Sequence, residues 1–308
     1  MRENGTAAVS APPGAIRRIV MAKYNTNVLG FGDNVVDIYE NSHMMYPGGN
    51  CVNLCAYSRM FGANRIAYMG YFGSDDIAEF VISVLQELEI ETVKCKQQVG
   101  ENGWSKCTLN DGDRVFGDYN EGGVRGKTPY ILDRFDLEYM KQFDFVHTGN
   151  YCYTESQLKP MKEAGIRISF DFSDDSSKEY YEKYAPYVTY AFCSFDGDEE
   201  AAKEHLRFMY SLGPELVSLT RGSKGCIMYD GEQFYVQPAT MIDEVVDTMG
   251  AGDSFLTSFM DCYIDQIKKG TEKPDAIRTA LAEASKFAAH VCTLDGAFGY
   301  GKTITREI

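Results

Sequence analysis

The sequence predicts an α/β fold, in which a mostly parallel β-sheet is flanked by helices and carries a small β-sheet as a lid. From about residue 144 onward, short apolar strands alternate with helical segments, which is the pattern of repeated β-α units. Between residues 92 and 124, short alternating runs and polar turns are typical of a separate small sheet. The 308 residues, 44% of them hydrophobic, suffice for one large domain with such an appendage.

The first third of the chain supplies one strand and two helices. The apolar run at residues 28–32 predicts a buried strand. Residues 50–61 predict a helix that ends at Gly62, because glycine is the commonest residue just past a helix. Residues 74–76 predict the start of the next helix, where carboxylates lie near the positive end of the helix dipole.

The expected lid contains a β-hairpin. Residues 104–109 alternate between apolar and polar side chains, and a polar turn at 110–113 follows them. Residues 38–47 are expected to add one or two short strands. We therefore divide the chain into a flexible extension over 1–26 and one domain over 27–308, with lid segments near 38–47 and 92–124.

The second half of the chain is expected to form the other strands of the large sheet and the helices between them. Ligands of open α/β sheets bind beyond the carboxyl ends of the strands, so the site is expected in the loops that follow strands. The expected strands are 145–147, 166–172, 188–193 and 216–220, and the expected helices run from Thr154 to near Gly165, over 198–212, and from near Gly250 and Pro274.

Composition narrows the possible partners. A net charge of −15 disfavours nucleic acid and anionic membranes, which would both be repelled. The nine cysteines are scattered, so they predict neither a disulfide framework nor a zinc site. Cys51 and Cys55 share a helix face, but free cysteines are usually small buried hydrophobes. Residues 1–20 lack the apolar stretch of a signal peptide, and no run is long enough to span a bilayer. We expect a reduced, cytoplasmic protein.

The strongest chemical signal is a glycine-rich turn that opens a helix. Its small residues let backbone N–H groups approach an anion, and the helix dipole adds to the attraction. Asp253 beside this turn can accept a proton from an attacking hydroxyl while the N–H groups stabilise a phosphoryl group in transfer. The alternative is that Asp253 only caps the helix. The stretch reads Asp247, Thr248, Met249, Gly250, Ala251, Gly252 and Asp253.

A second glycine turn precedes the helix expected at 50–61. Its carboxamides both donate and accept hydrogen bonds, which suits the recognition of several sugar hydroxyls. Two carboxylates near the end of the first strand add acceptors. Taken alone, the pattern is equally a simple turn followed by a helix start. The residues are Asp33, Asp37, Gly48, Gly49, Asn50 and Asn53.

Together the two stretches resemble the two signatures of the ribokinase-like (PfkB) carbohydrate kinase family, in the same order, with the resemblance covering about residues 27–300. The resemblance implies a Rossmann-type domain with a lid over the sugar, and ATP-dependent phosphorylation of a sugar. Asp253 would be the catalytic base and Gly250, Ala251 and Gly252 the anion hole. The substrate would contact the Asp and Asn residues of the first stretch with Gly48 and Gly49. The nucleotide would contact Thr220, Arg221, Gly222, Gly225 and Gly296.

Cofactors and partners follow from the same resemblance. Mg²⁺ would arrive with ATP, but the family's Asn-x-x-Glu motif is missing from residues 193–199. The metal ligands are therefore unknown, with Asp198 or Glu199 as candidates. A monovalent cation such as K⁺ beside residues 247–249, and a homodimer formed through the lid sheets, are also implied.

Three segments, at 32–39, 113–122 and 170–174, resemble fructoselysine 6-kinases, which phosphorylate the 6-hydroxyl of a fructosamine. Acidic residues of the expected hairpin would favour the ammonium of such a substrate, and Arg114 could pair with its carboxylate. The alternative is that these charges only solvate an exposed hairpin. The acidic residues are Asp111, Asp113, Asp118 and Glu121.

Several functions stay open from the sequence alone. The substrate could be fructoselysine, another ketose or a nucleoside, and the chain could also be a non-catalytic sugar sensor on the same fold. Retention of Asp253 with its whole glycine turn argues against the sensor. No GxGxxG follows the first strand, which disfavours a dinucleotide oxidoreductase. His147 ends a strand at the expected active edge, so a contact with substrate is open.

Overall fold

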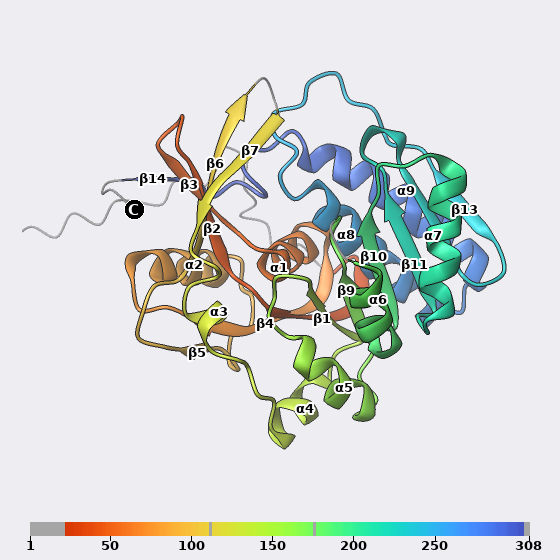
Figure 1. Cartoon of the computed structure of the whole chain (residues 1–308), viewed down its shortest axis with the longest axis horizontal. Helices are drawn as coiled ribbons and strands as arrows, with labels where there is room; N and C mark the ends of the chain where they lie inside the picture. The colour runs from red at the N-terminus through yellow and green to blue at the C-terminus, as the bar shows by residue number, and fades with distance from the viewer. Residues whose placement is uncertain (1–21, 111–112, 175–176, 305–308) are drawn as a thin grey trace, which may run out of the picture.

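The computed structural model describes residues 22–110, 113–174 and 177–304, which form two β-sheets with helices around the larger one (Figure 1). The large sheet has nine strands. In spatial order these are β13 (Phe234–Gln237), β12 (Cys226–Tyr229), β11 (Leu216–Thr220), β10 (Tyr190–Ser194), β9 (Ile168–Asp171), β8 (Phe145–Gly149), β1 (Tyr24–Gly32), β4 (Ala63–Phe72) and β5 (Lys96–Gln97).

The large sheet is parallel from β5 to β11, and only β12 and β13 run antiparallel. The expected mostly parallel α/β sheet is therefore confirmed. The sequence patterns did not predict β4, which pairs with β1 and lies next to the edge strand β5. This strand starts directly after Gly62, without an intervening loop, and its first residues include the polar Asn64 and Arg65. Residues 24–26, assigned to the extension, lie in β1 instead.

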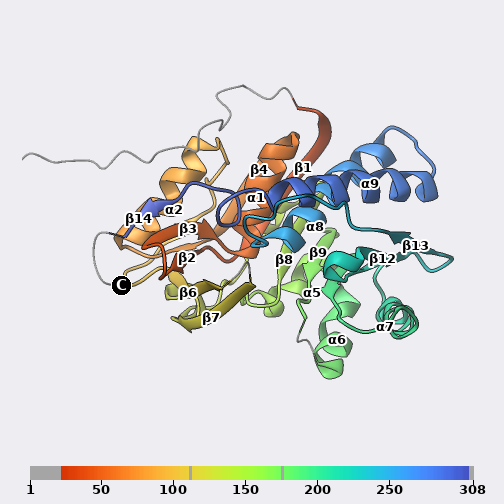
Figure 2. The same cartoon turned by 90° about the horizontal axis from the view of Figure 1, so that it is seen from above.

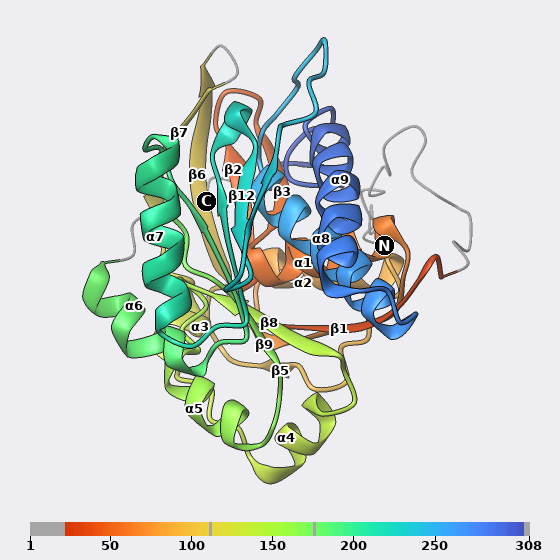
Figure 3. The same ribbon diagram turned by 90° about the vertical axis from the view of Figure 1, so that its right-hand side faces the viewer.

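Helices cover both faces of the large sheet, because successive residues of a strand point to opposite faces. Val28 of β1 belongs to one hydrophobic cluster and its neighbour Leu29 to the other. Figures 2 and 3 show the two helical layers. The first layer contains α1 (Asn50–Phe61), α2 (Asp76–Glu87), α8 (Ala251–Lys268) and α9 (Lys273–Val291), and the second contains α4 (Arg134–Met140), α5 (Glu155–Glu163), α6 (Lys178–Tyr184) and α7 (Glu199–Ser211).

Local sequence signals set several helix ends. Gly62 ends α1 in the left-handed conformation that glycine adopts without strain. The Asp75 side chain accepts a hydrogen bond from the N–H of Ala78 and so caps α2. The remaining short helical segments are α3 (Val124–Lys127) and the 3₁₀ turns η1 (Ala185–Tyr187) and η2 (Gly222–Lys224).

The second sheet has five strands and lies to one side of the large sheet, where its β6–β7 hairpin projects away from the body (Figure 1). It confirms the expected small sheet and the hairpin within residues 92–124. None of the helices in the described part of the chain has the length and apolar character of a membrane span. The strands are, in spatial order, β14 (Lys302–Thr303), β3 (Met44–Gly48), β2 (Val35–Tyr39), β6 (Gly103–Asn110) and β7 (Asp113–Tyr119).

Candidate active site

Asp253 lies in the first turn of α8, where two helix N-termini meet. Its carboxylate accepts hydrogen bonds from the side-chain amides of Asn50, at 2.9 Å, and Asn53, at 2.7 Å, both in the first turn of α1. Gly250, just before α8, has a φ of 72°. A side chain at Gly250 would collide with the hydroxyl of Tyr57, so this close approach of α8 to α1 requires glycine.

The environment of Asp253 suits a general base. Burial raises its pKa to about 6, and the charge of Asp33 adds to this, while the hydrogen bonds from Asn53 and Asn50 oppose the rise. A carboxyl with a pKa near the working pH is ionised at neutral pH and still basic enough to take a proton.

Asn50 connects Asp253 to a second carboxylate and to a histidine. Its side-chain nitrogen also donates to Asp171 at the end of β9, at 3.1 Å, and its oxygen lies 2.6 Å from Nε2 of His147 in β8. Burial lowers the pKa of His147 to about 3, so the ring is neutral. Because the Asn50 oxygen only accepts, Nε2 carries the proton and Nδ1 accepts from the Ser169 hydroxyl at 3.0 Å. This chain of bonds fixes the orientation of the Asn50 amide.

Asp171 is the second partly exposed carboxylate of this group. Its other oxygen accepts from the backbone N–H of Ser173 at 2.9 Å. Burial and the nearby charge of Asp253 raise the pKa of Asp171 to about 7. Asp171, Asp253, Asn50, Asn53 and His147 are hereafter called the carboxylate cluster.

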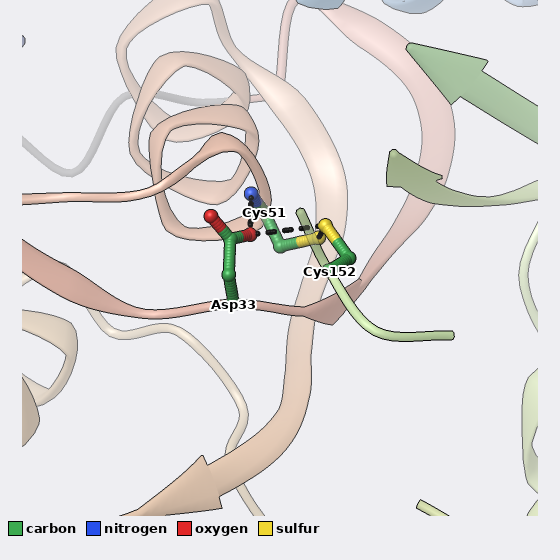
Figure 4. A group of neighbouring side chains, drawn as sticks. All are labelled: Asp33, Cys51 and Cys152. Atoms are coloured by element: carbon green, nitrogen blue, oxygen red, sulfur yellow. Dashed lines mark hydrogen bonds between the residues drawn. The ribbon is translucent and has the colours of Figure 1, made fainter. Parts of the chain in front are cut away.

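Asp33 supports the cluster from the end of β1. Its two oxygens accept from the backbone N–H groups of Asn50 and Cys51, each at 2.9 Å, so it caps α1. The thiol of Cys152 donates to Asp33 at 3.2 Å and lies 3.5 Å from the thiol of Cys51 (Figure 4). Burial raises the pKa of Cys51 far above that of a free thiol, which keeps this sulfur protonated. Cys55 instead donates to the carbonyl of Ala67. All nine cysteines are free.

The glycines of the first stretch make room for carboxylates. A side chain at Gly48 would collide with the carboxylate of Asp37, and one at Gly49 would lie 2.8 Å from Asp33. Gly49 also has a φ of 97°, which favours glycine. Asp37 is buried in β2 of the small sheet. This stretch therefore connects the small sheet to the start of α1.

A cleft of about 480 Å³ opens on the other side of the α8 N-terminus. Ala251 and Gly252 line it, and so do Thr220, Gly222 and Gly225 at the end of β11. Its other walls come from α9, from the end of β13 and from the irregular segment 238–245, and they are mainly small or apolar. A cleft of this kind accepts a flat ring on apolar surface and places phosphates at a helix N-terminus. The apolar wall includes Pro238, Met241, Ile242, Val245, Ala288 and Ala289.

Comparison with known proteins identifies the family. A family model described as "pfkB family carbohydrate kinase" matches residues 19–297. The chain belongs to this family. It is 35% identical over 276 residues to fructosamine kinase FrlD of Bacillus subtilis, covering 89% of this chain and 93% of the relative. It is 31% identical over 255 residues to fructoselysine 6-kinase of Escherichia coli, covering 83% and 94%. The chain is thus an ATP-dependent sugar kinase.

Solved structures agree on the fold. Ribokinase from Giardia lamblia superposes with a TM-score of 0.76 at 17% identity, covering 91% of this chain and 97% of that one. Arabidopsis thaliana ribokinase complexed with ribose and ATP superposes with a TM-score of 0.71 at 18% identity, covering 89% and 95%. The chain therefore has the ribokinase-like fold that its two glycine stretches imply.

Several residues expected at the kinase site do not line this cleft. Gly296 does not line the cleft but packs against the ring of Tyr46 in β3. Arg221 does not line it either, and its guanidinium donates to the carbonyl of Gly197 at 3.2 Å. Asp198 caps α7, and Glu199 pairs with Lys203 at 2.8 Å. The Arg114 side chain, and Asp111, lie outside the described part of the structure.

Sequence reasoning missed two parts of the site. Asp171 appeared only within a resembling segment, and the cleft wall at 238–245 was not identified at all. Asp171 ends a strand at the carboxyl edge of the sheet, which is the signal that could have singled it out. The wall has no periodic pattern, so no comparable signal marks it.

Proposed function

We propose that this kinase phosphorylates the 6-hydroxyl of a fructosamine, with fructoselysine as the first candidate and Asp253 as the base. The observation that carries the proposal is the position of Asp253. Two carboxamides hold it at the N-terminus of α8, immediately after two residues that line the cleft. The relatives named as a fructosamine kinase and a fructoselysine 6-kinase support the substrate class.

In the proposed mechanism, adenine packs on the apolar wall of the cleft, and the phosphates lie between the β11 loop and the start of α8. Backbone N–H groups of Gly250, Ala251 and Gly252 stabilise the charge on the γ-phosphoryl group during transfer. The sugar lies between Asp253 and the small sheet, where Asp37, Gly49 and Asn53 contact its hydroxyls. Asp253 takes the proton of the 6-hydroxyl while the hydroxyl oxygen forms a bond to the γ-phosphorus. The bond from that phosphorus to ADP breaks in line with this attack.

Mg²⁺ belongs to the proposal because it neutralises phosphate charge when bound with ATP. Asp198 and Glu199 do not fit as its ligands, since both are engaged by α7 and neither lines the cleft. A K⁺ ion beside residues 247–249, a cytoplasmic location and a homodimer are further parts of the proposal. The exposed apolar side chains of Val115, Phe116 and Tyr119 on β7 support a dimer through the small sheet.

The test is ADP release with ATP and Mg²⁺ across fructoselysine, other fructosamines, fructose, ribose and adenosine. We expect the highest kcat/KM with a fructosamine. If kcat/KM were highest with a neutral ketose or a nucleoside, the chain would still be a kinase, but the proposed substrate would be wrong. Mass spectrometry and NMR of the product identify the phosphorylated hydroxyl, and phosphate on any other oxygen would contradict the proposed orientation.

A further inference from the structure

The carboxylate cluster carries negative charge that none of the described basic side chains balances. Asp253 and Asp171 accept hydrogen bonds from the amides of Asn50 and Asn53 and from the N–H of Ser173, and all of these donors are neutral. Among the side chains that the structure describes, no lysine or arginine bonds to either carboxylate. Each of the two carboxyls has a raised pKa, which reflects the free energy of holding charge there. A cationic ligand would lower that free energy.

The two carboxylates are close enough to contact one small ligand. One oxygen of each accepts from the same nitrogen of Asn50, at 3.1 and 2.9 Å, so these oxygens lie within about 6 Å of each other. Both side chains are partly exposed. At the end of β8, Gly149 contributes no side chain, and a Cβ there would lie 3.1 Å from the Asn50 oxygen and 3.3 Å from Cβ of Asp171. Glycine at this position lets the end of β8 pack closely against Asn50 and Asp171.

We propose that Asp171 binds the secondary ammonium of a fructosamine while Asp253 faces its 6-hydroxyl. This inference rests on the proposed function and names the residue that selects the cationic substrate. A fructosamine carries its amine and its 6-hydroxyl at opposite ends of one sugar, which matches two acceptors at this separation. The ammonium donates a hydrogen bond to Asp171, without proton transfer between them.

Asp171 is better placed for this role than the acidic residues of the β6–β7 hairpin. Asp118 and Glu121 are exposed, so water and salt screen their attraction for an ammonium. Asp171 instead lies in a partly buried site, where the same attraction is stronger. Each Asp171 oxygen already accepts one hydrogen bond and keeps one lone pair, which suffices for an ammonium donor. A divalent metal ion is a poorer match, because it needs several oxygen ligands.

The experiment compares Asp171→Asn with the wild type on a matched pair of substrates. Fructoselysine carries the secondary ammonium. Acetylation of that nitrogen gives a derivative in which this position has no charge. We expect kcat/KM for fructoselysine to fall by about 10- to 100-fold in the variant, because a charge-assisted hydrogen bond is lost. The value for the neutral derivative, or its inhibition constant where turnover is slow, should stay within about threefold.

Two control variants remove the same charge nearby. Asp174→Asn changes an exposed carboxylate in the same loop, and Asp118→Asn changes one on the hairpin. Both should keep the ratio between the two substrates. An equal loss on both substrates in Asp171→Asn, a higher Mg²⁺ requirement in that variant, or a changed ratio in Asp118→Asn would each overturn the inference. Wild-type protein that phosphorylates no fructosamine would instead overturn the proposed function.

Discussion

The carboxylate cluster and the cleft lie on two sides of the same helix start, yet different interactions build them. In the cluster, side-chain hydrogen bonds of 2.6 to 3.1 Å join α1, α8, β8 and β9. The cleft is shaped by backbone at the end of β11 and by small and apolar side chains of 238–245 and α9. Exchanging one atom in the cluster changes its hydrogen bonds and acid–base behaviour. In the cleft, each apolar contact contributes only a modest part of the free energy of ligand binding.

The largest expected effect tests the cluster side of this comparison. Asp253→Asn keeps the shape of the side chain but removes the proposed base. We expect kcat to fall by at least about 100-fold, because proton transfer from the hydroxyl loses its acceptor. ATP binding in the cleft, measured by calorimetry, should stay within about threefold.

The matched control is Asp275→Asn, in which the carboxylate is exposed on α9 and pairs only with Arg278. This variant should keep wild-type kcat. If Asp253→Asn turned over at more than a tenth of the wild-type rate, Asp253 would have no role as base.

The next effect tests the packing of the start of α8, which borders both the cluster and the cleft, against α1. Gly250→Ala places a methyl group against the Tyr57 hydroxyl, which donates to the carbonyl of Ala297 at 2.5 Å. We expect α8 to shift relative to α1, with kcat falling by about 10- to 100-fold, since displacements near 1 Å at reacting groups have such effects. Steady-state kinetics and the melting temperature measure both consequences.

Gly270 provides the control at the other end of the same helix. It has a φ of 81°, and a Cβ there would meet no atom within 4 Å. Gly270→Ala therefore carries the backbone strain alone, at about 1 kcal/mol, and should lower the melting temperature without lowering kcat. Equal kcat in the two alanine variants would show that the contact with Tyr57 does not position Asp253.

A smaller effect tests how the amide of Asn53 influences the pKa of Asp253. Asn53→Ala removes a hydrogen bond that lowers the pKa of Asp253, so this pKa should rise above its value of about 6. As the proposed base, Asp253 must be ionised, so kcat/KM should fall as the pH drops through its pKa. The acid limb of the pH profile should move to higher pH by about one unit. At pH 6 a shift of about one unit lowers kcat/KM by about fivefold.

Asn64→Ala is the matched control for this substitution, because Asn64 is exposed and donates only to the side chain of Asn27. Its pH profile should coincide with that of the wild type. An acid limb that moved to lower pH in Asn53→Ala would reverse the assigned direction and contradict the role of the amide.

The sequence predicted the parts of the cluster that depend on local signals. Asn50 and Asn53 follow a glycine turn and open a helix, and Gly250 precedes another, so all three could be assigned from patterns of a few residues. The contacts of Asn50 with His147 and Asp171 join residues 97 and 121 positions apart. These contacts depend on where β8 and β9 end beside α1, which no local pattern specifies.

The cleft was less predictable for a different reason. Its apolar wall at 238–245 is irregular backbone, which has neither the period of a helix nor that of a strand. The resemblance to the family assigned Gly296 to the nucleotide site; this glycine does not line the cleft, and with a φ of 61° it lies close to the ring of Tyr46. The antiparallel β12–β13 edge was missed, although its short strands lie on either side of a glycine-containing turn.

The smallest expected effect tests the cleft itself. Val245 lines the wall and is 50% exposed, so a bound adenine would cover apolar surface that Val245→Ala partly removes. The loss of about 1 kcal/mol should raise KM for ATP by about fivefold, with kcat and KM for the sugar unchanged. Val246→Ala is the control, because Val246 is adjacent but does not line the cleft. A fall in kcat as large as that from Asn53→Ala would mean that the wall also positions the reacting groups, and the two regions would then not be separable.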